Sequence, residues 1–95
     1  MQALGPTLGV TWRQVSIRNA RTRWGSCSFT GRLNFNYRLI MAPSEVIDYV
    51  VMHELLHRKE LNHSSRFWAL VARHYPGYQE AKRWLKQYGP FLSLP

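Results

Sequence analysis

The feature that most constrains this chain is the segment of residues 53–63, which reads HELLHRKELNH. It places His53 and His57 four positions apart, with Glu54 beside the first histidine. Residues four apart on an α-helix lie one turn above each other on the same face, so both imidazoles can bind one metal ion. Two such ligands and a carboxylate that handles the metal-bound water are what a zinc hydrolase needs. The segment therefore predicts a zinc site on a helix.

The residues around this motif argue against a surface helix that carries two histidines and a glutamate by chance. Such a helix would have a polar face in contact with water. Here apolar residues surround the motif on almost all sides: Val46, Ile47, Tyr49, Val50, Val51, Met52, Leu55 and Leu56. A helix that is apolar nearly all round is buried. Buried histidine and glutamate side chains are costly without a partner, so we expect these residues to have one.

A catalytic zinc site needs a third protein ligand, and the candidates that follow are Glu60, His63, His74 and Glu80. If the helix continued to His63, this residue would point about 80° away from His53 and could not share the ion. Asn62, however, tolerates the left-handed conformation in which helices end, and Arg58 and Lys59 suit a helix C-terminus. A stop just before His63 favours this residue as third ligand. The two later candidates remain alternatives, and we interpret Glu60 as a solvated charge.

Length and cysteine content limit the class of protein. The 95 residues, of which 45% are hydrophobic, predict a single folded domain over residues 1–95. No apolar run has membrane-spanning length, and no segment has the pattern of a signal peptide. Cys27 is the single cysteine, which excludes an internal disulfide and indicates the reducing cytoplasm. We interpret Cys27 as a small packed residue and not as a metal ligand.

The net charge of +8, from 13 Lys and Arg against 5 Asp and Glu, favours anionic partners. The basic residues are spread along the chain, and no block of five like charges occurs. This distribution predicts nonspecific association with nucleic acid or acidic partners. It gives no support to sequence-specific nucleic-acid recognition.

Two segments of the N-terminal half have the alternation that is typical of β-strands. Residues 10–18 alternate Val15 and Ile17 with polar neighbours, and residues 33–39 read LNFNYRL in strict alternation. The segment between them, residues 19–31, is short and rich in turn-forming residues. We therefore expect the two strands to pair like a hairpin.

Three helices are expected in the C-terminal half. The metal helix should run from about Pro43 to about Glu60, where Pro43 suits a helix start. A second should run over about 65–75 with Ser64 or Ser65 as its N-cap. A third should run over about 78–88 and end at Gly89 and Pro90. No repeat or low-complexity segment marks a second domain.

Three stretches occur in order along the chain: RWGSCS at 23–28, LNFN followed by RL within 33–39, and the segment 53–63 followed by RFW at 66–68. Together they resemble the YgjP-like metallopeptidase family, which is akin to the WLM and SprT-type zinc proteases. The resemblance runs from about Val10 to about Gly89. Three ordered motifs with matching spacing are more specific than the zinc motif alone.

The resemblance implies a zincin-type α+β fold, with a short antiparallel sheet packed on the metal-binding helix and two further C-terminal helices. It implies one zinc ion bound by His53, His57 and His63, with Glu54 as general base. Members of the family are usually longer, with an extra N-terminal region, so this chain resembles their C-terminal catalytic portion. The larger metzincin proteases share the ligand spacing but have glycine in place of Glu60 and a Met-containing turn, so their other residues are not carried over.

These observations predict a zinc-dependent metallopeptidase that hydrolyses peptide bonds in proteins or peptides with a zinc-activated water. A strand edge near the cleft can align an extended substrate by backbone pairing. The candidate substrate-binding residues are Arg23, Trp24, Gly25 and Asn36, although a purely structural role for 23–28 explains that stretch equally well. The candidates for stabilising the oxyanion are Tyr75, Tyr78, Tyr88 and His74, and the sequence does not separate them.

Two alternatives belong to other classes of function. One is a nucleic-acid-associated module with a structural or degenerate zinc site, which the charge of +8 motivates. The other is a zinc hydrolase of small amides. Glu54 argues against a structural site, because a closed site needs no general base. A fourth protein ligand, such as Cys27, would reverse that argument.

Overall fold

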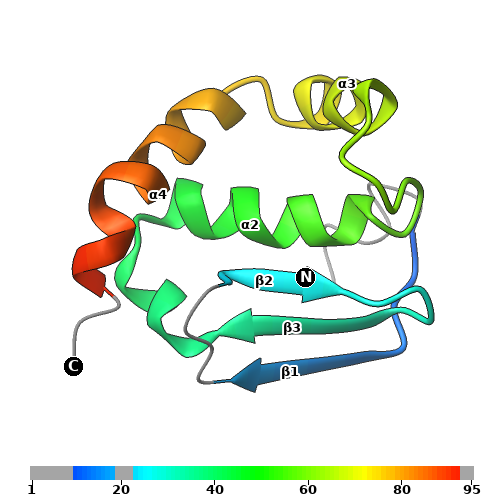
Figure 1. Ribbon diagram of the computed structural model, residues 1–95, viewed down its shortest axis with the longest axis horizontal. Coiled ribbons are helices and arrows are strands. Elements are labelled where there is room, and N and C mark those ends of the chain that lie inside the picture. The colour runs from blue at the N-terminus through cyan, green and yellow to red at the C-terminus, as the bar shows by residue number, and fades with distance from the viewer. Residues whose placement is uncertain (1–9, 19–22, 93–95) are drawn as a thin grey trace.

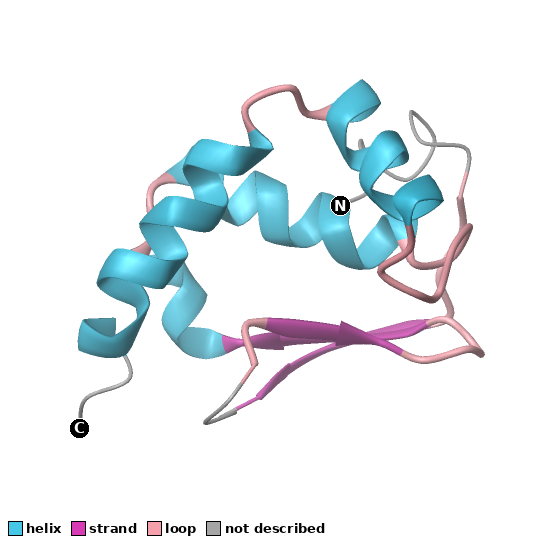
Figure 2. Ribbon diagram, turned by 45° about the horizontal axis from the view of Figure 1, so that its top comes forward, coloured by secondary structure: helices cyan, strands magenta, loops and turns pink. Residues whose placement is uncertain are grey.

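The computed structural model describes residues 10–18 and 23–92, which form a small sheet and a set of helices around a central helix. In chain order the elements are β1 (Gln14–Arg18), β2 (Gly25–Cys27), β3 (Arg32–Asn36), the 3₁₀ helix η1 (Tyr37–Met41), α2 (Ser44–Leu56), α3 (Ser65–His74) and α4 (Tyr78–Leu92). The sheet lies on one side of α2, and α3 and α4 lie on its other side (Figure 1, Figure 2). The predicted α+β class is thus confirmed.

The sheet has the strand order β1-β3-β2 and is mixed. β2 pairs with β3 in antiparallel fashion, whereas β1 pairs with β3 in parallel. The predicted hairpin between β1 and β3 is therefore wrong. The prediction of a purely antiparallel sheet is also wrong. The reason is that the turn-rich segment contains a strand of its own and a tight turn at Ser28–Gly31, where Gly31 has a φ of 91° that suits glycine. β2 and β3 form the hairpin, and β1 pairs with the other edge of β3.

β3 ends at Asn36, three residues earlier than the alternation predicted. The Asn36 side-chain oxygen accepts a hydrogen bond from the backbone N–H of Arg38 at 3.0 Å, which starts η1 in place of further strand. Its side-chain amide donates to the carbonyl of Arg23 at 3.3 Å and ties the start of η1 to the chain before β2. Strict alternation is lost after this point, because Tyr37 is 48% exposed while Leu39 is buried.

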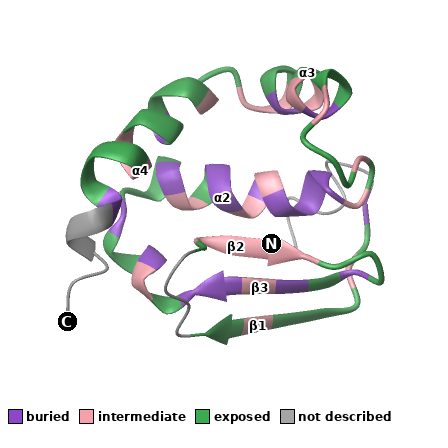
Figure 3. Cartoon of the chain, viewed as in Figure 1, coloured by how far each residue is buried: buried purple, intermediate pink, exposed green. Residues whose placement is uncertain are grey.

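The core lies between β3, α2 and α3 (Figure 3). Its largest fully buried side chains are Phe67, Leu33, Leu55, Leu56 and Val71. Burying a side chain of this size stabilises the fold by about 1.5–3 kcal/mol. The prediction that the metal helix is buried is confirmed, since most of α2 is inaccessible to water. β1 contributes little, because Val15 is 40% and Ile17 is 64% exposed.

α2 ends at Leu56, earlier than expected, and the chain leaves it through tight turns. The backbone N–H of Arg58 donates to the carbonyl oxygen of Leu55 at 3.0 Å, and that of Lys59 donates to the carbonyl oxygen of Leu56 at 2.9 Å. Both are hydrogen bonds of the 3₁₀ type. No non-glycine residue in 10–18 and 23–92 has a positive φ, so the expected left-handed stop at Asn62 is wrong. The 3₁₀ turns reverse the chain in its place.

The later helices begin as expected but end differently. Ser64 is the N-cap of α3, and its hydroxyl accepts a hydrogen bond from the backbone N–H of Phe67 at 3.3 Å. α4 continues to Leu92, so the predicted stop at Gly89 and Pro90 is wrong. The missing N–H of a proline removes one hydrogen bond, and so close to the helix end this does not break α4. None of the helices among the described residues has both the length and the apolar character needed to cross a membrane.

Candidate metal centre

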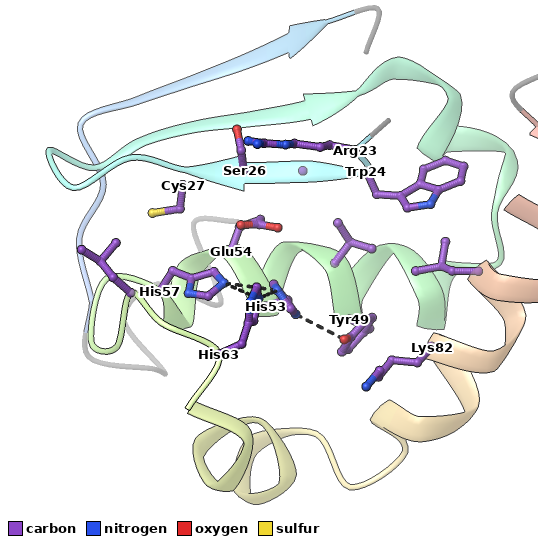
Figure 4. Close-up of a pocket in the computed structure, with 14 residues that line it drawn as sticks. Arg23, Trp24, Ser26, Cys27, Tyr49, His53, Glu54, His57, His63 and Lys82 are labelled. Carbon is purple, nitrogen blue, oxygen red and sulfur yellow. Dashed lines mark hydrogen bonds between the residues drawn. The ribbon is translucent and has the colours of Figure 1, made fainter. Parts of the chain in front are cut away.

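The three predicted histidine ligands form a triangle at the C-terminal end of α2. His53 and His57 project from consecutive turns, and the loop after α2 brings His63 back to face them (Figure 4). The Nε2 atoms of His53 and His63 are 3.1 Å apart, and that of His57 lies 3.2 Å from each. Among the described residues, these histidines are the group of His, Cys, Asp and Glu side chains arranged to hold a metal ion.

The triangle has the dimensions and chemistry of a metal site. A tetrahedral ion with Zn–N bonds of about 2.0–2.1 Å holds its nitrogens about 3.3–3.4 Å apart, close to the separations seen here. His57 Nδ1 lies 2.9 Å from the carbonyl oxygen of Glu60 and must donate to it. The lone pair of its Nε2 therefore faces the other two rings, in the tautomer that a ligand needs.

The environment also favours neutral imidazoles, the form that binds metals. Burial is the main cause that lowers the pKa of His53 to about 3, and the neighbouring His57, His63 and Lys82 add to the effect. Burial lowers the pKa of His57 as well. The hydroxyl of Tyr49, one turn before His53, lies 3.2 Å from His53 Nδ1 and fixes the ring on the side away from the triangle.

Two aromatic residues of α3 pack against the histidine rings. Phe67 is fully buried, and its ring stacks on His57 with a centroid distance of 4.2 Å and an angle of 8°. Trp68 stacks on His63 at 5.8 Å and 23°. Neither aromatic residue was assigned to the site from the sequence. The RFW motif after His63 was the available signal, but spacing alone does not show which rings it touches.

Glu54 lies beside the triangle, between α2 and β2 (Figure 4), and is 7% exposed. Burial raises the pKa of its carboxyl group to about 7, and the charge of Arg23 partly offsets this rise. Gly25 of β2 leaves the space that the carboxylate occupies. A Cβ atom at Gly25 would lie 2.9 Å from Glu54 Cγ and 3.2 Å from its Oε2.

A cleft of about 620 Å³ surrounds Glu54 and the triangle, which is within the usual range of small-molecule sites. Three of the four candidate substrate-binding residues line it, namely Arg23, Trp24 and Gly25. Asn36 does not, because its side chain forms the cap of η1. Tyr49 and Lys82 line the cleft although the sequence did not single them out. Nothing local in the sequence could have indicated that α4 places Lys82 there.

Other candidates lie elsewhere. The residues proposed for the oxyanion are absent from the described lining of the cleft: Tyr75, Tyr78, Tyr88 and His74. The hydroxyl of Tyr75 instead donates to the carbonyl of Glu45 at 2.7 Å. His74 and Glu80, the alternative third ligands, do not belong to the metal-binding group. Cys27 lines the cleft but is not part of that group either, and its thiol lies 3.4 Å from the carbonyl of Ser28.

The segment 23–28 combines a structural role with a place at the cleft. Trp24 packs against Gly89 of α4, where an added Cβ would lie 3.0 Å from the indole Cζ2. The carbonyl of Trp24 accepts a hydrogen bond from the backbone N–H of Asn36 at 2.9 Å. These contacts tie the start of β2 to α4 and to the end of β3, and so keep Gly25 against Glu54.

Comparison with known proteins shows what this chain is similar to. A family model described as YgjP-like, metallopeptidase domain, matches residues 1–88. The crystal structure of the metallopeptidase zymogen of Pyrococcus abyssi abylysin superposes with a TM-score of 0.77 and 27% sequence identity. The superposition covers 90% of this chain and 89% of that chain. No curated protein matches the sequence.

Proposed function

Because this chain belongs to the YgjP-like metallopeptidase family, we propose that His53, His57 and His63 hold one zinc ion and that Glu54 is the general base of peptide hydrolysis. The family and the fold make the chain a metallopeptidase, and hence a hydrolase of protein or peptide substrates. The observation that carries the finer proposal is the triangle of Nε2 atoms 3.1–3.2 Å apart with a buried carboxylate beside it.

A zinc ion at this triangle would lower the pKa of water towards about 7 and polarise a peptide carbonyl. Glu54 accepts a proton from the attacking water and later delivers it to the leaving amine. Burial holds the pKa of Glu54 at about 7, which suits a group that must both take and give a proton near neutral pH. With Nε2 turned to the metal, His53 Nδ1–H donates to the Tyr49 hydroxyl and His57 Nδ1–H donates to the Glu60 carbonyl, and these hydrogen bonds keep the imidazoles in position.

We further propose that the substrate lies along β2 in an extended conformation. β2 pairs with β3 on one side, and Gly25, Ser26 and Cys27 all line the cleft. Backbone N–H and C=O groups at such an edge can bind a peptide as an added strand. This arrangement would carry the scissile bond past Glu54, whose side chain lies against Gly25.

The alternative of a purely structural zinc site would require a fourth protein ligand. Within the described residues, the group that can hold a metal consists of the histidine triangle, and neither Cys27 nor a carboxylate joins it. This supports a catalytic centre with a position open to substrate. Cytoplasmic location and nonspecific binding to nucleic acid or acidic partners remain proposals from the single cysteine and the net charge of +8.

The test compares Glu54→Gln with wild type and with Glu80→Gln, which removes a carboxylate away from the cleft. Zinc content is measured by elemental analysis, and cleavage is measured on casein and on a peptide mixture. We expect Glu54→Gln to keep its zinc and to lose cleavage by about 10²-fold or more, as removal of a general base does. Glu80→Gln should keep both. Equal cleavage by wild type and Glu54→Gln would refute the proposal.

A further inference from the structure

Lys82 brings a positive charge from α4 to the rim of the metal centre. Its ammonium lies 4.1 Å from the centroid of the Trp68 ring, which is within the range of a cation–π contact. Trp68 in turn stacks on His63 at 5.8 Å and on Tyr78 at 5.8 Å. Figure 4 shows the Lys82 side chain extending towards the part of the cleft where Tyr49 and the histidines lie. The ammonium is thus held by a ring that itself contacts a proposed metal ligand.

The charges that line the cleft are unequal. Two cations line it, Arg23 and Lys82, against a single carboxylate, that of Glu54. Arg23 acts on Glu54: burial raises the pKa of that carboxyl group, and the charge of Arg23 lowers it again in part. Among the described residues, Lys82 has no carboxylate partner, and its contact is with the Trp68 ring. The cleft therefore has a cation that no acidic side chain in the described part of the chain matches.

We propose that Lys82 is a specificity-determining residue that pairs with a substrate carboxylate next to the cleaved bond. This inference rests on the proposed peptidase function. The carboxylate is that of an acidic side chain or of a peptide C-terminus, which offer Lys82 the same chemistry. Cation–π contact limits the freedom of the ammonium before substrate binds, so less entropy is lost when the ion pair forms. An ammonium–carboxylate hydrogen bond is stronger than one between neutral groups.

The experiment must separate this local contact from the general attraction of acidic peptides to a protein of charge +8. Peptides are made in pairs that differ by Glu or Gln at each position beside the cleaved bond. Each pair is made with a free and with an amidated C-terminus. They are cleaved by wild type, Lys82→Gln, Lys82→Arg and Lys86→Gln. The last variant is the matched control, because it removes the same charge from α4 at a residue that does not line the cleft.

We expect wild type to prefer the carboxylate-bearing peptides by about tenfold in kcat/KM, the ratio that a charge-assisted hydrogen bond gives. Lys82→Gln should bring this ratio close to one, whereas Lys82→Arg and Lys86→Gln should keep it. If the preference depends on the Glu side chain, the acidic residue is the source. If it disappears with amidation, the C-terminus is the source.

Two results would overturn the inference: a preference that survives in Lys82→Gln, or an equal loss of kcat on all peptides, which would place Lys82 at the transition state. A binding measurement keeps this outcome separate from that of the proposed function. Affinities of the same peptides are measured for Glu54→Gln with and without Lys82→Gln. If wild type cleaves nothing, the peptidase proposal fails. In the Glu54→Gln protein, equal affinities both within the Glu/Gln pairs and within the free/amidated pairs would refute the role of Lys82.

Discussion

Replacing Gly25 by alanine should separate metal binding from catalysis. The added Cβ would lie 2.9 Å from Glu54 Cγ, 3.2 Å from Glu54 Oε2 and 3.2 Å from Phe35 Cδ1. Phe35 is 5% exposed and belongs to the core, so it has little room to move. The Glu54 side chain must therefore shift out of its place beside the histidines. The histidines lie away from this contact and keep their arrangement.

The size of the effect follows from the geometry. Overpacking of this kind destabilises a protein by about 1–3 kcal/mol, which a folded domain can tolerate. Displacing a catalytic group by about 1 Å lowers the rate by about 10²-fold. We expect Gly25→Ala to remain folded and to bind zinc like wild type, but to lose kcat/KM by about two orders of magnitude.

The matched control is Gly77→Ala, because a Cβ at Gly77 has no atom within 4 Å and its φ is not positive. Urea unfolding, zinc content and peptide cleavage are measured on both variants. If Gly25→Ala cleaves peptides as fast as wild type, Glu54 does not act from the place assigned to it. If instead Gly25→Ala loses its zinc, the contact between Gly25 and Glu54 also supports the histidines, and metal binding is not separate from catalysis.

Three further predictions concern the metal centre. His63→Ala should lose most of the bound zinc on elemental analysis, while His74→Ala keeps it; the opposite pattern would move the third ligand to α3. Tyr49→Phe removes the hydroxyl 3.2 Å from His53 Nδ1 and should weaken zinc affinity by about tenfold in a competition titration, as loss of a group that orients a ligand does. The last prediction compares the free energies of unfolding of metal-free wild type and Glu54→Gln, measured in urea at several pH values. Wild type should lose stability relative to Glu54→Gln as pH rises from 4.5 to about 7, because Glu54 ionises first in the unfolded chain. A stability difference between the two proteins that does not change with pH would contradict the burial of this carboxyl group.

Local periodicity predicted the parts of the site that lie on one element. The spacing of His53 and His57 needs only a helix, and the apolar residues around them indicated that the helix is buried. His63 was predicted because the helix had to stop before it. The stop itself comes from 3₁₀ turns after Leu56 and not from Asn62. The sequence thus indicated that the chain reverses but not the backbone conformation that reverses it.

Contacts between distant segments could not be read from the sequence. The three residues of β2 are too few for an alternation pattern, so their insertion between α2 and β3 was missed, and with it the parallel pairing of β1. The side chain of Asn36 ended a strand that alternation alone would extend to Leu39. Lys82 reaches the cleft only because α4 packs against α2, which is a property of the tertiary fold. Tyr49 lies four residues before His53 on the same helix face, so its place was available from the spacing and was overlooked.

The most direct test of the central claim is a zinc titration of chelator-stripped protein, with peptide cleavage and bound zinc measured at each step. We predict that wild-type cleavage rises with added zinc and saturates when one ion per chain is bound. Glu54→Gln should bind the same amount of zinc and remain inactive throughout. Cleavage by the stripped protein that does not depend on zinc, or a titration of Glu54→Gln that recovers wild-type activity, would contradict the account.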